Sequence, residues 1–406
     1  MTHTFFTKST KFTIKLFVLA FVITSCSSSD SDSSDIPERT GTPAINIPDS
    51  TAELVLNVAT TNSTSAGIGT VANVTPNALV GEMNAGWNMG NYFDVPFRDK
   101  STWGNPEPTK ELIDKVNETG FNTIRIPVTW RTHQQNVPPY QIELSYLQRV
   151  QKVVDFAMEN DMYILLNTHH DTDVFQPIVS TEAVVSERLK NTWLQIATYF
   201  EAYDEKLLFE ILNEPRVQGN REEWVAGNAS TRRVLNNLHK VGVDAIRSTG
   251  GNNTNRQLVI STWAGKTNET AMNALVIPNN DPNIIITVHA YTPFKVAHDG
   301  DRPWNGQTDL NTVRRDLDNV KRKWITENNR PVILGEWAML NSNPRTGKST
   351  TKQARAEYSE IYVREATERG MPTILWDDNG WYQALNRTTL EWDSQGQADA
   401  IKQESR

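Results

Sequence analysis

The feature that most constrains the fold is a series of eight short apolar runs, separated by longer segments with helical periodicity. The runs occupy residues 84–88, 122–127, 162–168, 207–212, 257–262, 284–288, 331–335 and 372–376. Near-continuous apolar strands are typical of a parallel sheet that is covered by helices. Eight such strands with helices between them favour an α/β fold, a closed (β/α)8 TIM barrel, over an open doubly wound sheet.

The segments between the runs carry apolar residues at helical spacing. One predicted face consists of Leu147, Val150, Val153, Val154 and Ala157, and another of Val234, Leu238, Val241 and Ala245. Gly120, Gly250 and Gly370 each follow a helical stretch, where we expect a left-handed cap. No GxGxxG or P-loop pattern opens a helix, which argues against nucleotide binding.

The first 75 residues differ in composition from the rest. In residues 1–25, three lysines precede an apolar run that is too short to span a bilayer, as in a lipoprotein signal peptide. Cys26 follows directly in a loosely matched lipobox, and because it is the single cysteine, we expect lipid attachment there. Residues 26–75 read as a Ser/Thr/Asp-rich linker that cannot bury a core, and residues 76–402 as the catalytic barrel.

This organisation predicts where the protein acts. The acidic serine run after Cys26 resembles surface-export signals of Bacteroidetes-type lipoproteins, so we expect an outer-membrane lipoprotein at the cell surface or outside the cell. Contact with the membrane is expected through the lipid anchor alone. The formal net charge of −8 argues against nucleic-acid binding, which depends on phosphate neutralisation. We expect a monomer.

Polar, titratable and aromatic residues follow the predicted strands, at the end of a barrel where active sites lie. They are Asn88, Arg125, His169, His170, Asn213, Glu214, His289, Tyr291, Glu336 and Trp376. A rim with a purely structural role does not need such residues, so we interpret them as a candidate active site.

Glu214 and Glu336 carry the most information in this set. Glycosidic cleavage needs one carboxylic acid for the leaving oxygen and a second carboxylate on the other face of the sugar. Two close carboxylates do not both ionise easily, so we expect one pKa to rise and that group to be the acid. The strand ends predict a two-carboxylate glycosidase and leave the stereochemical outcome open.

The neighbours fit supporting roles. Arg125 is expected to hold Glu336 ionised, and Tyr291 to orient it. Asn213 is placed to bind the sugar 2-hydroxyl, and Trp376 to form an apolar floor under the reacting ring.

The run His169-His170-Asp171 raises the alternative of a metal site, which Asp173 and His289 could complete. Adjacent histidines on a strand point to opposite sides, so both rarely bind one ion. We therefore expect hydrogen bonding to substrate hydroxyls, with no metal and no cofactor.

Several segments together resemble glycoside hydrolase family 5. They are Ile124-Arg125-Ile126-Pro127, Asn167-Thr168-His169-His170, Leu212-Asn213-Glu214-Pro215, His289-Ala290-Tyr291 and Gly335-Glu336-Trp337. The segments Gly86–Asn91 and Trp103–Pro106 resemble its subfamily 4, and the resemblance covers roughly residues 76–400. It departs at Asp171-Thr172-Asp173-Val174 and at Ser261-Thr262-Trp263, on the rim.

The resemblance implies retaining, endo-acting hydrolysis of β-1,4-glucans, with Glu214 as acid/base and Glu336 as nucleophile. Arg125, His169, Asn213, His289, Tyr291 and Trp376 match the remaining active-site positions of the family. The expected partner is a β-glucan chain or oligosaccharide: cellulose, mixed-linkage glucan or xyloglucan. The alternatives are a non-catalytic, glycan-binding surface lipoprotein and an enzyme of this fold specific for β-mannan or xylan.

Overall fold

A closed barrel of eight parallel strands forms the centre of the protein, within residues 66–97, 103–343 and 345–406, which the computed structural model describes. The strands are β1 (Gly86–Met89), β2 (Thr123–Ile126), β3 (Tyr163–Asn167), β4 (Leu207–Glu210), β5 (Leu258–Ser261), β6 (Ile284–His289), β7 (Val332–Trp337) and β10 (Thr373–Asp377). They follow one another around the barrel in chain order, and a separate hairpin, β8 (Ser342–Asn343) and β9 (Lys348–Ser349), follows β7. Each strand coincides with one predicted apolar run, so the prediction of a (β/α)8 barrel is confirmed.

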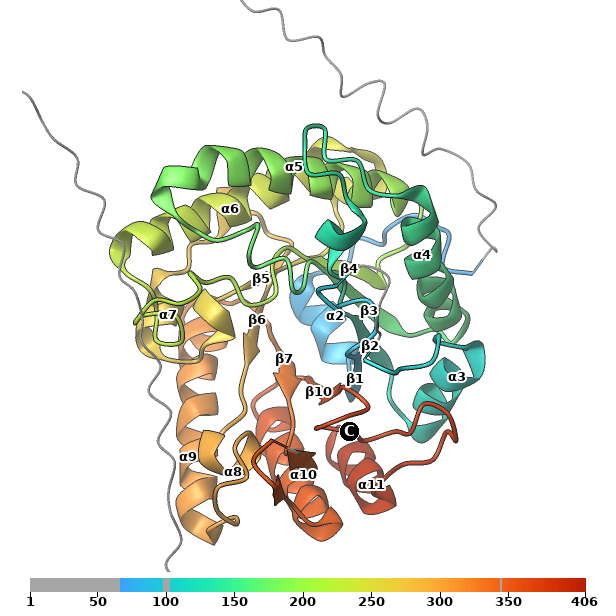
Figure 1. Ribbon diagram of the computed structural model, residues 1–406, viewed down its shortest axis with the longest axis vertical. Helices are drawn as coiled ribbons and strands as arrows, with labels where there is room; N and C mark the ends of the chain where they lie inside the picture. The colour runs from blue at the N-terminus through green and yellow to red at the C-terminus, as the bar shows by residue number, and fades with distance from the viewer. Residues whose placement is uncertain (1–65, 98–102, 344) are drawn as a thin grey trace, which may run out of the picture. The chain divides into compact units, whose positions relative to one another are not determined.

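Helices surround the strands, as Figure 1 shows. The longer ones are α3 (Lys110–Thr119), α4 (Leu144–Glu159), α5 (Glu182–Tyr199), α6 (Ala229–Ser248), α9 (Gly306–Val320), α10 (Lys352–Thr367) and α11 (Gln395–Glu404), and the short ones are α7 (Glu269–Ala274) and α8 (Phe294–Ala297). The predicted face of α4 is buried throughout. On α6 the predicted face is buried except for Val241, which is half-buried. Apolar spacing therefore located the faces that pack on the barrel.

The three glycines predicted to end helices all have positive φ. Gly120 is the left-handed cap of α3, with φ 113° and ψ 8°, and Gly370 follows α10 with φ 72°. Gly250 follows α6 with φ 74°, but its ψ of −153° lies outside the left-handed helical region. At this position the chain turns into a 3₁₀ segment, Gly251–Thr254, rather than closing a helical cap.

A short helix, α2 (Pro76–Glu82), closes the amino-terminal end of the barrel. Its start is encoded locally, because the Thr75 side chain accepts a hydrogen bond from Ala78 N and Pro76 occupies the first turn. Leu79, Val80 and Met83 pack into one apolar cluster with side chains from the strands. These partners are Tyr163, Leu165, Leu208, Val259, Ile285, Ile333 and Ile374.

Residues 66–75, the described part of the predicted linker, lie against the loops that follow α5 and α6. Gly69 N donates to Ala202 O at 3.1 Å, and Asp204 N donates to Gly67 O at 2.8 Å. The Asn252 side chain accepts from Val71 N at 3.0 Å and donates to Gly69 O at 2.6 Å. These contacts lead the chain into α2.

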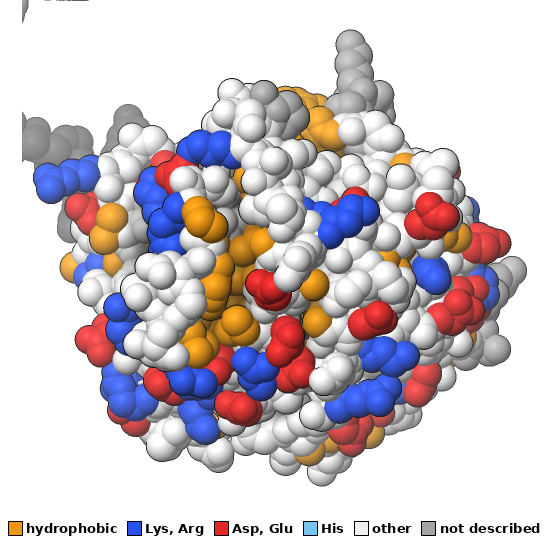
Figure 2. Space-filling model, turned by 90° about the horizontal axis from the view of Figure 1, so that it is seen from below, with side chains coloured by type: hydrophobic (Ala, Val, Ile, Leu, Met, Phe, Trp, Pro, Cys, Tyr) orange, Lys and Arg blue, Asp and Glu red, His pale blue; other side chains and the backbone are white. Residues whose placement is uncertain are grey.

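The predicted signal peptide, Cys26 and the first part of the linker lie outside the described residues, so the predicted domain boundaries stay predictions. Among the helices that the structure describes, none is both long and apolar enough to cross a membrane. Acidic and basic side chains are interspersed on the face shown in Figure 2, with a strip of hydrophobic side chains between them.

Candidate active site

All ten predicted site residues lie at the carboxyl-terminal rim of the barrel, and contacts between side chains join them. Five come from the strands themselves, and one of these, Glu336 of β7, lies at the same level as His289 of β6. Hydrogen bonds and ion pairs link Asn88, Arg125, His169, Asn213, Glu214, His289, Tyr291 and Glu336, while Trp376 and His170 touch His169 through their rings.

Glu336 is held from two sides. Arg125 Nη1 donates to its Oε1 at 2.7 Å, and the Tyr291 hydroxyl donates to its Oε2 at 3.0 Å. Burial and the neighbouring Glu336 charge raise the pKa of Tyr291 well above its ordinary value, so the phenol keeps its proton and remains a donor. The two charge-assisted or phenolic hydrogen bonds fix the orientation of the Glu336 carboxylate.

Arg125 is fully buried and binds a second carboxylate that we did not predict. Its Nε and Nη2 atoms donate hydrogen bonds to Glu210 at 2.6 and 3.0 Å, and Nη1 donates to Glu336. Burial lowers the pKa of Arg125, but Glu210 and Glu336 outweigh it and raise the pKa. A signal for Glu210 was present: an acidic residue within an apolar strand that is buried on both faces requires a partner.

The two asparagines complete the surroundings of Arg125. Asn213 Oδ1 accepts from Arg125 Nη2 at 2.7 Å, and Asn88 Oδ1 accepts from Nη1 at 2.9 Å. Asn88 is fully buried, and its Nδ2 donates to Gly335 O at 2.9 Å. Asn88 therefore holds the Arg125 guanidinium from the barrel interior, whereas Asn213 holds it from the carboxyl-terminal rim.

The Glu214 carboxylate makes its closest polar contact with His289, whose Nδ1 lies 2.9 Å from Glu214 Oε1 and 3.6 Å from Glu336 Oε2. We expected the second carboxylate to raise the pKa of the acid, and for Glu214 this is wrong. Burial raises the pKa, but the hydrogen bond and charge of His289 and the charges of Arg216 and Lys266 outweigh it and lower the pKa. Three nearby cationic groups therefore outweigh the effect of burial on the pKa of Glu214.

The distance between the two acidic groups is short. One oxygen of Glu214 and one of Glu336 lie within 4.8 Å of each other, and a His289 nitrogen lies within the same distance of both. Carboxyl groups about 5–5.5 Å apart are typical of glycosidases that retain configuration, and about 6.5–9.5 Å of those that invert it.

Trp376 and His169 form a flat wall beside the carboxylates. Their rings stack at 5.6 Å between centroids, with planes 4° apart. Gly90 makes room for the indole, because a Cβ there would lie 2.7 Å from Trp376 Cζ2. Trp376 is largely buried, with 8% of its surface exposed, and offers an apolar ring at the rim.

His169 and His170 do not point to opposite sides, contrary to our expectation. Both follow the last residue of β3, Asn167, so strand alternation no longer applies, and their rings lie 4.5 Å apart. Asp94, His169 and His170 offer potential ligand atoms within 4.8 Å of one another. Both ring nitrogens of His169 already lie within hydrogen-bond distance of side-chain amides. Nδ1 lies 3.2 Å from Asn167 Nδ2, and Nε2 lies 3.4 Å from Asn213 Nδ2.

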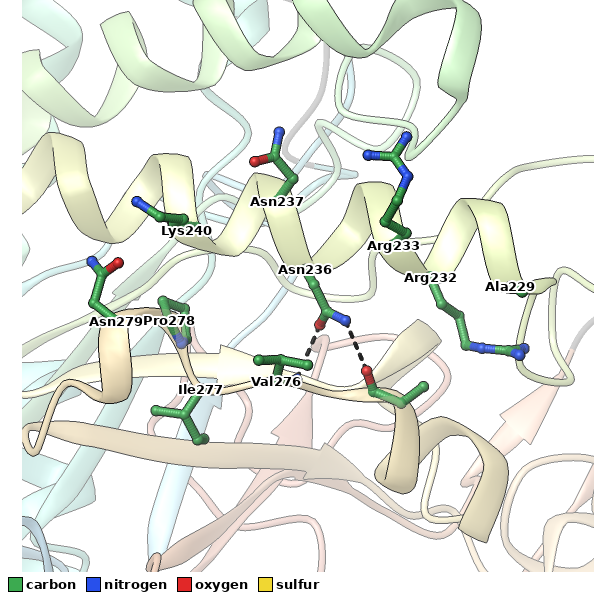
Figure 3. Close-up of a pocket in the computed structure, with 11 residues that line it drawn as sticks. Ala229, Arg232, Arg233, Asn236, Asn237, Lys240, Val276, Ile277, Pro278 and Asn279 are labelled. Atoms are coloured by element: carbon green, nitrogen blue, oxygen red, sulfur yellow. Dashed lines mark hydrogen bonds between the residues drawn. The ribbon is translucent and has the colours of Figure 1, made fainter.

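A cavity of about 610 Å³ lies away from this rim, between α6 and residues 274–279. Figure 3 shows Asn236 between the two elements, with hydrogen bonds to Val276 N and Ala274 O. None of the predicted site residues lines this cavity.

Comparison with known proteins gives close matches over the barrel. Cellulase/esterase CelE of Acetivibrio thermocellus is 40% identical over 324 residues, which cover 77% of this chain and 38% of that protein. Endoglucanase B of Clostridium cellulovorans is 35% identical over 335 residues, covering 79% of this chain and 74% of that protein. The chain thus spans less than half of the first of these relatives and about three quarters of the second.

Solved structures show the same likeness. A GH5-4 broad-specificity endoglucanase from Clostridium acetobutylicum superposes with a TM-score of 0.77 at 38% identity, covering 81% of this chain and 99% of the other. A GH5 xyloglucan-specific endo-β-1,4-glucanase from a metagenomic library, in complex with cellotriose, gives a TM-score of 0.73 at 35% identity, covering 80% and 97%. Residues 88–380 match the model of the cellulase family, glycosyl hydrolase family 5. The chain therefore belongs to glycosyl hydrolase family 5, as its motifs predicted.

Proposed function

We propose that this protein is an endo-acting glycoside hydrolase that cleaves β-1,4-glucosidic bonds with retention of configuration. Glu336 is the nucleophile and Glu214 the acid/base. The observation that carries the proposal is the pair of carboxylates within 4.8 Å, one held by Arg125 and Tyr291 and the other by His289. This separation supports a covalent intermediate, because it leaves no room for a water molecule between the nucleophile and the sugar.

In the first step, Glu336 attacks the anomeric carbon while Glu214 protonates the leaving oxygen. Glu214 and His289 lie within hydrogen-bond distance and hold one proton between them, which the pair supplies as the glycosidic bond breaks. Tyr291 and Arg125 keep Glu336 oriented until its charge passes into the glycosyl ester.

In the second step, Glu214 acts as a base and removes a proton from water, which attacks the anomeric carbon and releases Glu336. Forming the ester removes the negative charge of Glu336, which favours the carboxylate form of Glu214 and lets it act as the base. Release of Glu336 restores that charge and favours return of the proton to the Glu214–His289 pair. Asn213 and His169 stand beside Glu336 and are placed to bind the 2-hydroxyl of the reacting sugar, and the Trp376 ring lies under that sugar.

The substrate class follows from the relatives. They include endoglucanases of broad specificity and a xyloglucan-specific one, so a β-1,4-glucan backbone is the common element. We propose cellulose-type, mixed-linkage and xyloglucan chains as the substrates. A panel of purified β-glucans, β-mannan and xylan tests this choice, and turnover on mannan or xylan alone would contradict it.

The stereochemical outcome and the role of Glu214 can be tested together. In Glu214→Ala, azide is expected to restore turnover of an activated aryl β-cellobioside and to give a β-glycosyl azide, measured by NMR. An α-glycosyl azide would contradict the proposed role. Binding of β-glucan without release of reducing sugar by the unaltered protein would instead favour a non-catalytic glycan-binding protein.

We further propose that residues 1–25 are a lipoprotein signal peptide, that Cys26 carries a lipid and that residues 26–75 connect it to the barrel at the cell surface. The motivation is the lysine-rich start, the apolar run and the position of Cys26. Metabolic labelling with a fatty acid is expected to mark the expressed protein and not Cys26→Ser. Equal labelling of both would exclude this attachment site.

A further inference from the structure

Arg216 lies beside Glu214, and no step described above uses it. Its Nη1 donates to the backbone oxygen of Glu214 at 2.8 Å and lies 3.5 Å from Glu214 Oε2. The Arg216 side chain is largely buried, with 12% of its surface exposed. One guanidinium therefore contacts both the backbone and the carboxylate of the proposed acid/base.

Neighbouring groups hold Arg216 in this position. Its Nε donates to Glu223 Oε1 at 3.1 Å, and its guanidinium carbon lies 4.1 Å from the centre of the Trp224 ring. Glu223 is itself fixed, because its Oε2 accepts from Gly219 N and its backbone oxygen accepts from Trp263 Nε1, both at 2.8 Å. An arginine stacked on an indole and paired with a fixed carboxylate keeps little freedom.

Lys266 brings a second positive charge to the same place, from the loop after β5. Its ammonium lies 5.4 Å from the centre of the Trp224 ring, and its side chain is half-buried. In the described part of the chain, no carboxylate lies within ion-pair distance of Lys266, so Glu214 experiences its charge uncompensated. Lys266 follows Ser261-Thr262-Trp263, one of the two rim segments that depart from the family pattern.

We propose that Arg216 and Lys266 are positioning residues that stabilise the carboxylate form of Glu214 and set the pH at which the Glu214–His289 pair loses its proton. This inference rests on the proposed role of Glu214. The charged groups that face Glu214 are His289 from β6, Glu336 from β7, Arg216 from the loop after β4 and Lys266 from the loop after β5. Both cations favour Glu214 as the base of the second step and oppose its protonation before the first.

The test is the pH dependence of kcat/KM on a soluble β-glucan, whose basic limb reports loss of the proton held by the free enzyme. Arg216→Met removes an opposite charge that lies 3.5 Å from the Glu214 carboxylate, so the basic limb is expected to move to higher pH by about one pH unit. Lys266→Met is expected to move the limb in the same direction by a smaller amount. Glu223→Gln removes a negative charge beside Arg216, so its limb is expected to move to lower pH.

Two variants serve as controls. Lys323→Met removes a cation that also lies beside an indole, 5.6 Å from the Trp324 ring. Lys323 precedes the amino-terminal end of β7, far from Glu214, so the basic limb is not expected to move. Arg216→Lys keeps the charge, so most of the original profile is expected to return.

The opposite signs expected for Arg216→Met and Glu223→Gln separate electrostatics from a general loss of packing. A lower rate at every pH with an unmoved basic limb in both variants would overturn the inference. If Glu214→Ala itself keeps its turnover, the proposed function fails. If Glu214→Ala is inactive and the limbs do not move, only the role of Arg216 and Lys266 fails.

Discussion

The two ends of the barrel are built from different chemistry on the same strands. At the amino-terminal end, Leu79 and Val80 of α2 and Met83, which follows it, pack on apolar side chains such as Leu165 and Ile333. At the carboxyl-terminal rim, His169 follows β3 and Glu336 lies near the end of β7, and both belong to one network of buried polar and charged groups.

The difference shows how one barrel separates stability from function. Apolar burial stabilises by about 25 cal/mol per Å² and needs no partner of defined chemistry. Buried charges cost free energy unless each is paired, and they are retained where a reaction needs them. We therefore expect changes at the amino-terminal end to alter stability alone, and changes at the rim to alter activity first.

The largest effect is expected at Glu336. Glu336→Gln keeps the shape and removes the nucleophile, so turnover of barley β-glucan should fall about 10⁴-fold or more. The melting temperature should stay equal or rise, because one of two close carboxylates is gone. A reducing-sugar assay and thermal unfolding measure the two quantities. Turnover near that of the unaltered protein would show that Glu336 is not the nucleophile.

Arg125→Met is expected to affect both activity and stability. It leaves Glu210 buried without its cation, and breaking such a pair costs about 3–5 kcal/mol of unfolding free energy. Denaturant unfolding measures this cost. In the double variant Arg125→Met with Glu210→Gln, most of the stability should return while activity remains lost. Recovery of both would mean that Arg125 has a structural role only.

Leu79→Ala tests the other end of the barrel. Loss of a buried leucine in a packed cluster costs about 2–5 kcal/mol, and kcat per folded molecule should not change. Val276→Ala, at a residue with 59% of its surface exposed, is the matched control with little expected change. A large fall in kcat for Leu79→Ala would break the separation between the two ends.

The smallest effect concerns pH and stability at the rim. Asp171 is buried and accepts hydrogen bonds from Trp130 N and Arg131 N at 3.1 and 2.9 Å. Burial raises its pKa to about 6 despite these bonds. Because the folded pKa lies above the unfolded value of 3.8, stability should fall as pH rises from about 4 to about 6.

Asp171→Asn should remove that part of the pH dependence, about 2 kcal/mol, measured by thermal unfolding between pH 4 and 7. Leu79→Ala should shift the melting temperature equally at every pH in that range. An unchanged slope in Asp171→Asn would show that Asp171 is not the titrating group.

Much of the site was predictable because strand ends can be read along the chain. Nine of the ten predicted residues follow or end an apolar run, and parallel strands bring those ends to one rim; the tenth, Arg125, stands inside a run. Glu210 also stands inside an apolar run and was missed, because its contact with Arg125 forms only when the closed barrel brings β2 and β4 together. The positions of Arg216 and Lys266 beside Glu214 were not predictable from the sequence. Both lie in loops, and the neighbours of a loop residue are set only when the barrel folds.

The sequence by itself determined the alternation of strands and helices, the identity of the two carboxylates and the residues around them. These depend on local periodicity and on residue type, which the chain carries at every position. The tertiary structure decided the distance between Glu214 and Glu336, the side to which His169 and His170 point, and the lowered pKa of Glu214. Those depend on groups brought together by closure of the barrel, such as Arg125 and Glu336, which lie 211 positions apart in the chain.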